Sequence, residues 1–286
     1  MQTTQPVWPA HIYGPDDPPW GVGAAILVWL ASVMLLFFVP LLAGVAYIIP
    51  LLRRIPADKL KEVVGNDPHF LLVSVAAVIP AHLLTFGLVW FLVTGKGRRS
   101  FRDITGLRFS PQLGLFELFT CAGVAVLLLV LSGIIAHFFH GGETDLDKII
   151  SSSLAARYTV VVLAVFSAPL VEEAVYRGVL YPALQRAFGK WWAVLLVALL
   201  FAVVHVPQYW ANVGVIAAIT LLSLTLTLVR AQTGRLLPCI IVHLLFNGAS
   251  SLSILLDART QHAPQLPAPT GLLLLASLSH IAWLHF

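Results

Sequence analysis

Charged residues are scarce in this sequence. Asp, Glu, Lys and Arg together make up 10% of its 286 residues, whereas 59% are hydrophobic, and the mean hydropathy is +0.90. A soluble domain typically has about 25% charged and about 45–50% apolar residues. The composition therefore excludes an ordinary soluble domain and predicts an integral membrane protein. We expect no nucleic-acid partner, because the chain lacks a Lys/Arg-rich stripe with interleaved aromatic residues.

Cysteines and a basic N-terminal segment are also missing. The two cysteines, Cys121 and Cys239, fall inside apolar runs and predict free buried thiols rather than a disulfide framework. Residues 1–20 contain no Lys or Arg, so we expect no cleaved signal peptide there. They instead predict a flexible N-terminal tail, with Trp20 as an anchor at the membrane interface.

The sequence has no strand-length segments of alternating polarity, which argues against a β-barrel. It also has no internal repeat. Apolar segments can be counted against the roughly 20 residues that cross about 30 Å of hydrocarbon. We predict an all-α polytopic membrane helical bundle with about eight transmembrane helices, in which residues 21–286 form a single domain. The predicted spans are residues 21–52, 69–94, 113–139, 158–188, 191–206, 213–229, 236–256 and 271–286.

Basic residues in the loops predict the orientation, because Lys and Arg are enriched on the cytoplasmic side of membrane proteins. This rule puts the loop after the second span inside and the acidic loop after the third span outside, with both termini inside. The basic cluster 53–61 conflicts with the pattern unless the first or second span is re-entrant or tilted. The residues that favour the inside are Lys96, Arg98, Arg99, Arg102, Arg108, Arg186, Lys190, Arg230 and Arg235.

Several signatures of other chemistries are absent. The chain contains no HExxH motif, no GxGD motif and no pair of deep membrane aspartates. Ser132 and Ser167 lie outside any GxSxG-like setting and are typical of interhelical contacts. Residues 94–100 read TGKGRRS, which lacks the spacing of a phosphate-binding loop. The sequence therefore gives no support to helical zinc-protease, aspartyl, serine or nucleotide-dependent mechanisms.

Three charged residues interrupt the apolar run 158–188: Glu172, Glu173 and Arg177. A charge at mid-bilayer costs at least about 2.5–3.5 kcal/mol on insertion scales, so such residues are functional by default. On a helix Glu173 and Arg177 are four positions apart and can pair. Glu172 lies roughly 100° around the axis and is left free to face another group. A purely structural ion pair between helices is the alternative interpretation.

Two further polar pairs lie on later spans. Phe201 and His205 are four positions apart in FAVVH, and His243 and Asn247 are four positions apart in HLLFN. Two histidines and a carboxylate from three helices can either bind a divalent metal or activate a water molecule. An asparagine can donate to a developing oxyanion, and a buried glutamate is a suitable general base. Isolated histidines are read as interhelical hydrogen-bonding residues: His82, His137 and His280.

Together these motifs resemble those of the CPBP intramembrane proteases. That family includes CAAX prenyl endopeptidases, bacterial Abi proteins and bacteriocin-processing or immunity relatives. The motifs are EEAVYR at 172–177, FAVVH at 201–205 and HLLFN at 243–247, in this order and each within a membrane segment. The eight-span layout also suits the family. The resemblance implies a transmembrane protease domain with its catalytic core at about residues 158–256.

The resemblance also implies roles for the motif residues. Glu172 would activate the attacking water, and His205 would hold or coordinate it. His243 and Asn247 would complete the site and stabilise the oxyanion. Glu173 and Arg177 would position the helix through their pair.

Phe201 is a supporting residue in this interpretation. The residue types leave open whether a metal is required, and we favour a metal-free site with no cofactor. A divalent metal such as zinc remains the alternative. Its ligands would be Glu172, His205 and His243.

The resulting hypothesis is an intramembrane endopeptidase that cleaves a peptide bond near the membrane interface through a glutamate-activated water. Its partners would be a peptide or protein substrate, with or without a lipid group, and the lipid bilayer of a bacterial cell (inner) membrane. A non-proteolytic immunity or scaffold protein of the same fold is the alternative. A proton-relaying transporter is a third reading, against which the lack of inverted repeats counts.

Overall fold

The structure is a computed structural model that describes residues 13–65, 67–139 and 141–262. These ranges contain no β-strand, and seven of their helical segments are long and apolar enough to cross a membrane. Helices suit apolar spans because every backbone hydrogen bond is made within the segment. The predicted all-α polytopic bundle is therefore confirmed, and the protein is a multi-pass membrane protein. The predicted span 271–286 lies outside the described residues.

The seven spans agree with the predicted segments 21–256, and five of them are single helices. The second span is broken in two at Ala77. The spans are α1 (Val22–Leu51), α3–α4 (Pro68–Ala76 and Val78–Thr94), α6 (Phe116–Phe138), the composite segment Leu154–Phe188, α11 (Lys190–Tyr209), α12 (Val213–Thr233) and α13 (Leu237–His262). Three short helices connect them: α2 (Ala57–Gly65), α5 (Phe101–Thr105) and α7 (Asp145–Ser152).

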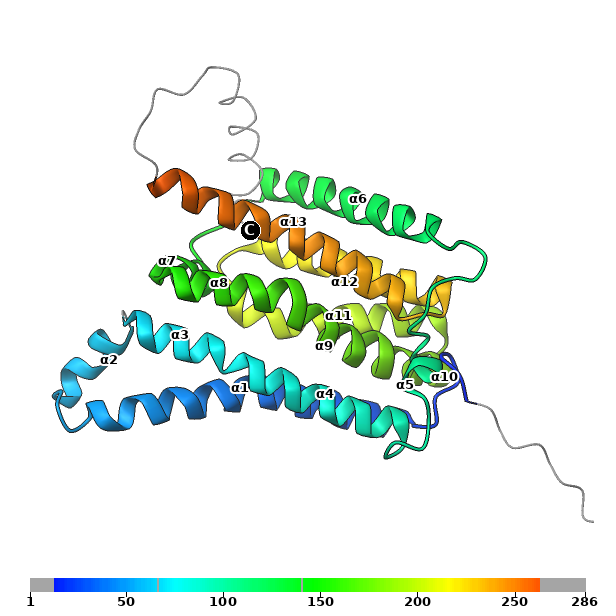
Figure 1. The fold of residues 1–286 in the computed structure, drawn as a ribbon, viewed down its shortest axis with the longest axis horizontal. Coiled ribbons are helices and arrows are strands. Elements are labelled where there is room, and N and C mark those ends of the chain that lie inside the picture. Colours follow the sequence, from blue (N-terminus) through cyan, green and yellow to red (C-terminus); the bar gives the residue numbers. More distant parts are fainter. Residues whose placement is uncertain (1–12, 66, 140, 263–286) are drawn as a thin grey trace, which may run out of the picture.

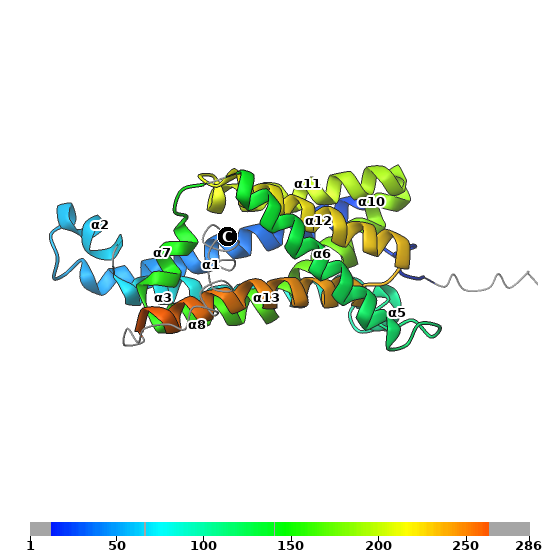
Figure 2. The same cartoon turned by 90° about the horizontal axis from the view of Figure 1, so that it is seen from above.

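The composite fourth span lies at the centre of the bundle. Figure 1 shows α1 with α3–α4 on one side of it and α6, α12 and α13 on the other. The turned view in Figure 2 separates α11 and α12 from the layer formed by α8 and α13. The largest buried cluster gathers around this span and includes Val179, Leu180, Tyr181 and Phe201. The central position explains why this span carries charges that a lipid-facing helix would not tolerate.

The fourth span is irregular along its length. It consists of α8 (Leu154–Val162), the π-helix η1 (Leu163–Ser167), α9 (Ala168–Glu173), the π-helix η2 (Ala174–Leu180) and α10 (Tyr181–Phe188). Pro182 is the second residue of α10 and has no N–H to donate to the preceding turn. Short π-helical stretches occur frequently at functional sites. Here two of them flank the six residues that contain both glutamates.

The loops at one end of the bundle are basic and packed together. The Leu236 amide donates to the Gly106 carbonyl at 3.2 Å, and Arg235 donates to the Arg108 carbonyl at 3.3 Å. This end of the bundle therefore contains the loops whose positive charge predicts the cytoplasmic side. In Figure 1, α1 and α3–α4 run the length of the bundle toward α2 at the other end, so a re-entrant first or second span is not supported.

Residues 13–20 fold against the basic end, which corrects the expected loose tail for this part of the chain. Trp20 is 5% exposed, and its indole N–H donates to the Val179 carbonyl at 3.1 Å. It is thus a buried contact with η2 and not an interfacial anchor. The cysteine prediction is confirmed, since Cys121 and Cys239 are both free and buried.

Candidate active site

The predicted ion pair between Glu173 and Arg177 is present and fully buried. Arg177 Nη1 lies 2.9 Å from Glu173 Oε1, and neither side chain is exposed. The remaining donors of Arg177 reach α12, where Nη2 contacts the Ser223 carbonyl and hydroxyl, each at 2.8 Å. Nε donates to the Thr227 hydroxyl at 3.2 Å. A buried charge needs such complete pairing, so this arginine fixes the fourth span against α12.

His243 joins the same carboxylate from α13. Its Nδ1 lies 2.8 Å from Glu173 Oε1, the atom that also accepts from Arg177. Because an arginine-paired carboxylate is an acceptor, Nδ1 carries the hydrogen and Nε2 keeps its lone pair. A carboxylate that holds one ring nitrogen in this way fixes both the tautomer and the orientation of a histidine.

Glu172 faces the other nitrogen of that ring. Its Oε2 lies 3.9 Å from His243 Nε2, and its side chain is 21% exposed, whereas Glu173 is completely buried. The two neighbouring glutamates therefore differ in role. Glu173 is buried, with Oε1 accepting from Arg177 and His243 and Oε2 without a hydrogen-bond partner, whereas Glu172 remains accessible at the edge of the site. This agrees with the prediction that Glu172 is left free by the Glu173–Arg177 pair.

Phe201 packs between the polar residues as a rigid spacer. It is 2% exposed, and its ring centroid lies 4.7 Å from that of His205 and 6.3 Å from that of His243. The Arg177 guanidinium lies 5.0 Å from the same ring centroid, within the range of a cation–π contact. Tyr176 packs edge-on at 4.9 Å. The predicted supporting residue therefore contacts both histidine rings.

His205 is held by its own helix. Its Nδ1 is 2.8 Å from the Phe201 carbonyl, which as an acceptor places the hydrogen on Nδ1. The ring stacks on Phe201 at an interplanar angle of 29°. Nε2 is consequently the nitrogen that remains for a water molecule or a substrate.

Asn247 contacts the first π-helix rather than the carboxylates. Its Nδ2 donates to the Ala164 carbonyl at 2.8 Å. An amide nitrogen carries two hydrogens, so one is still available for an oxyanion. The same π-helix contacts a third histidine, because His82 Nδ1 lies 2.6 Å from the Ser167 hydroxyl. His82 is thus an interhelical hydrogen-bonding residue, as predicted.

The metal alternative does not fit the observed arrangement. The hydrogen bonds of His205 and His243 use Nδ1 in both rings, so Nε2 is the ring nitrogen that either residue could offer to a metal. Within the described ranges, no three His, Cys, Asp or Glu side chains are grouped so that they could share one ion. The set Glu172, His205 and His243 is therefore not assembled as zinc ligands, which require donors at about 2.0–2.2 Å from one point.

The buried polar face of α12 was not predicted from the sequence. Ser223, Thr227 and Arg230 are all fully buried, and the first two receive Arg177. Their spacing of i, i+4 and i+7 is the signal that could have identified them, because it places three polar groups on one helix face. Arg230 was instead assigned to a cytoplasmic loop on charge alone.

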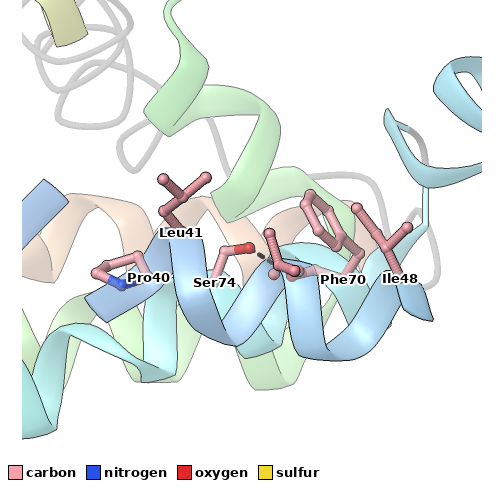
Figure 3. Close-up of a pocket in the computed structure, with 7 residues that line it drawn as sticks. Pro40, Leu41, Ile48, Phe70 and Ser74 are labelled. Carbon is pink, nitrogen blue, oxygen red and sulfur yellow. Dashed lines mark hydrogen bonds between the residues drawn. The ribbon is translucent and has the colours of Figure 1, made fainter. Parts of the chain in front are cut away.

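A separate cavity lies between α1 and α3. It has a volume of about 260 Å³ and an almost wholly apolar lining. Figure 3 shows Pro40, Leu41 and Ile48 of α1 beside Phe70 and Ser74 of α3, where the Ser74 hydroxyl donates to the Phe70 carbonyl at 2.8 Å. None of the predicted site residues lines this cavity, so it is not part of the site.

Comparison with known proteins identifies the central segment. Residues 154–249 match the family model described as type II CAAX prenyl endopeptidase Rce1-like. The matched range includes the EEAVYR, FAVVH and HLLFN motifs and all four predicted catalytic residues. The match confirms the resemblance to the CPBP and CAAX proteases. No match was found among curated proteins or among solved structures.

Proposed function

Because residues 154–249 are Rce1-like, we propose that this protein is an intramembrane endopeptidase whose nucleophile is a water molecule activated by Glu172. One observation carries the proposal: Glu172 Oε2 lies 3.9 Å from His243 Nε2, while Glu173 holds the opposite side of the imidazole ring. This separation is too long for a direct hydrogen bond and suits a water that bridges the two atoms.

The tautomer of His243 determines how such a water would sit. Its Nε2 is an acceptor, and so is the Glu172 carboxylate. A water between two acceptors donates one hydrogen to each, which leaves its oxygen lone pairs directed away from both. The arrangement supports attack by that oxygen on an amide carbonyl carbon placed on the open side of Glu172.

The proposed reaction moves one proton twice. Glu172 takes a proton from the water as the oxygen bonds to the carbonyl carbon, and the carbonyl oxygen becomes an oxyanion. The free hydrogen of Asn247 Nδ2 would stabilise that charge. The C–N bond then breaks, and the protonated Glu172 returns its proton to the leaving nitrogen. The products are a carboxylic acid and an amine, and Glu173 and Arg177 only position the ring.

The substrate would be a peptide or protein, with or without a lipid group, whose scissile bond reaches the site from the bilayer. The loop charges favour a bacterial-type inner membrane with the basic end in the cytoplasm. No step in this scheme uses a metal ion, because Glu172 itself takes and returns the proton.

A comparison of membranes tests the proposal. Membranes that contain wild-type protein or Glu172→Ala would be analysed by mass spectrometry for new peptide termini. We expect termini that depend on Glu172 and disappear in the variant, while both proteins insert equally. Identical sets of termini would overturn the enzymatic proposal, and a cellular phenotype that survives Glu172→Gln would favour a scaffold.

A further inference from the structure

A second buried arginine lies behind the site. Arg230 on α12 is completely buried, although the loop charges predict an exposed position for it. Its Nη1 pairs with Asp16 Oδ1 at 2.8 Å, and its Nη2 donates to the Pro15 carbonyl. Its guanidinium carbon lies 5.2 Å from the centroid of the Tyr181 ring. A buried charge must be paired and hydrogen-bonded, and these contacts supply the partners of Arg230.

The third donor of Arg230 reaches the catalytic span directly. Its Nε donates to the Arg177 carbonyl at 3.1 Å. In the π-helix η2 a carbonyl is paired with the amide five residues later, as Tyr176 is with Tyr181. The corresponding partner of the Arg177 carbonyl is Pro182, which has no N–H. Arg230 therefore donates to the Arg177 carbonyl, for which Pro182 offers no N–H. Arg177 is also the residue that pairs with Glu173.

The N-terminal turn is attached to the same segment by further contacts. Trp20 donates to the Val179 carbonyl at 3.1 Å, also in η2. Arg186 on α10 donates to the Pro18 carbonyl at 2.6 Å and to the Trp20 carbonyl at 2.9 Å. The turn itself is closed by a pair of backbone hydrogen bonds between Gly14 and Asp17, each 3.2 Å long.

These contacts form one continuous chain of interactions from the turn to the site. Asp16 holds Arg230, Arg230 holds the Arg177 backbone, and Arg177 holds Glu173. Glu173 in turn holds the His243 ring beside Glu172. We propose that Arg230, anchored by Asp16, is a positioning residue for the His243 imidazole, so that the turn of residues 13–20 supports the reacting groups. The catalytic part of this inference rests on the proposed function.

The test compares two neighbouring aspartates. Asp16 and Asp17 have side chains that are 53% and 45% exposed. Asp16 pairs with the buried Arg230, whereas Asp17 pairs with Arg186, whose side chain is 43% exposed. Asp16→Ala is therefore the perturbation and Asp17→Ala the matched control. Both variants remove one surface carboxylate, so a difference between them reports the contact with Arg230.

The first readout is independent of activity. The full-length protein in detergent micelles, labelled with ¹⁵N-histidine, gives the resonance of the His243 Nδ1–H that is hydrogen-bonded to Glu173. We expect Asp16→Ala and Arg230→Lys to shift this resonance and Asp17→Ala to leave it unchanged. A shift of equal size in both aspartate variants, or no shift in any variant, overturns the proposal.

The second readout is the rate at which new peptide termini appear in membranes. We expect about a tenfold loss for Asp16→Ala at an unchanged protein level, in keeping with a small displacement of a catalytic group. The control should stay within about twofold of wild type on the same reasoning. If the resonance shifts but wild-type membranes produce no termini, the proposed function fails and the positioning contact stands. Asp16→Ala could instead lower the thermal stability while the His243 resonance and the cleavage rate stay unchanged. That result would show that Arg230 only stabilises the fold, and it would overturn the proposal.

Discussion

Replacement of Arg177 by alanine tests the buried network at its centre. The side chain is completely buried, and among the described residues it shares the hydrogen bonding of Glu173 with His243. Its removal leaves a buried carboxylate without its cation and leaves the Ser223 and Thr227 hydroxyls without this donor. Breaking a buried pair by removing one partner typically costs about 3–5 kcal/mol. For a protein of this size the corresponding drop in melting temperature is about 6–20 °C.

The matched control is an ion pair at the surface. Lys148 and Asp145 are 2.9 Å apart, with side chains 59% and 76% exposed. Such pairs contribute at most about 1 kcal/mol, so Lys148→Ala should shift the melting temperature by no more than a few degrees. Thermal unfolding of both variants in the same detergent gives the comparison. Equal melting temperatures for the two variants would refute the argument that Arg177 compensates a buried charge.

Two further substitutions test the packing around the site. Phe201→Ala should destabilise the fold by about 3–5 kcal/mol and release the His205 ring, because Phe201 is 2% exposed. Phe119→Ala should have little effect, because Phe119 lies on the bundle surface and is 73% exposed. Gly106→Ala should destabilise the fold more than Gly114→Ala. Both glycines have a positive φ, +69° and +49°, but a Cβ at Gly106 would also lie 2.8 Å from the Gly234 carbonyl oxygen, whereas a Cβ at Gly114 would meet nothing within 4 Å. Chemical unfolding in detergent measures all four, and a reversed order within either pair would contradict the packing described.

Local spacing predicted much of the site. Glu173 and Arg177 pair as their four-residue separation requires, and Phe201 stacks on His205 for the same reason. The apolar runs predicted the spans because length and hydropathy alone determine which segments can cross a bilayer. These features depend on one helix at a time, so the sequence is sufficient to find them.

Contacts between distant segments could not be predicted in this way. Arg230 and Asp16 are 214 residues apart, and loop charge alone placed Arg230 at the membrane surface. The π-helices were also unexpected, since a one-residue change in hydrogen-bond register leaves no clear mark in an apolar sequence. For that reason the contact of Asn247 with the Ala164 carbonyl in η1 was not foreseen.

The central claim is that Glu172 activates water beside an oriented His243. The most direct measurement is the single-turnover cleavage rate of purified protein in liposomes, with a peptide taken from the membrane comparison. We expect Glu172→Gln to lower this rate by about 10²–10⁴-fold, the usual contribution of a general base, while His137→Gln leaves it unchanged. Cleavage by Glu172→Gln at the wild-type rate would contradict the account.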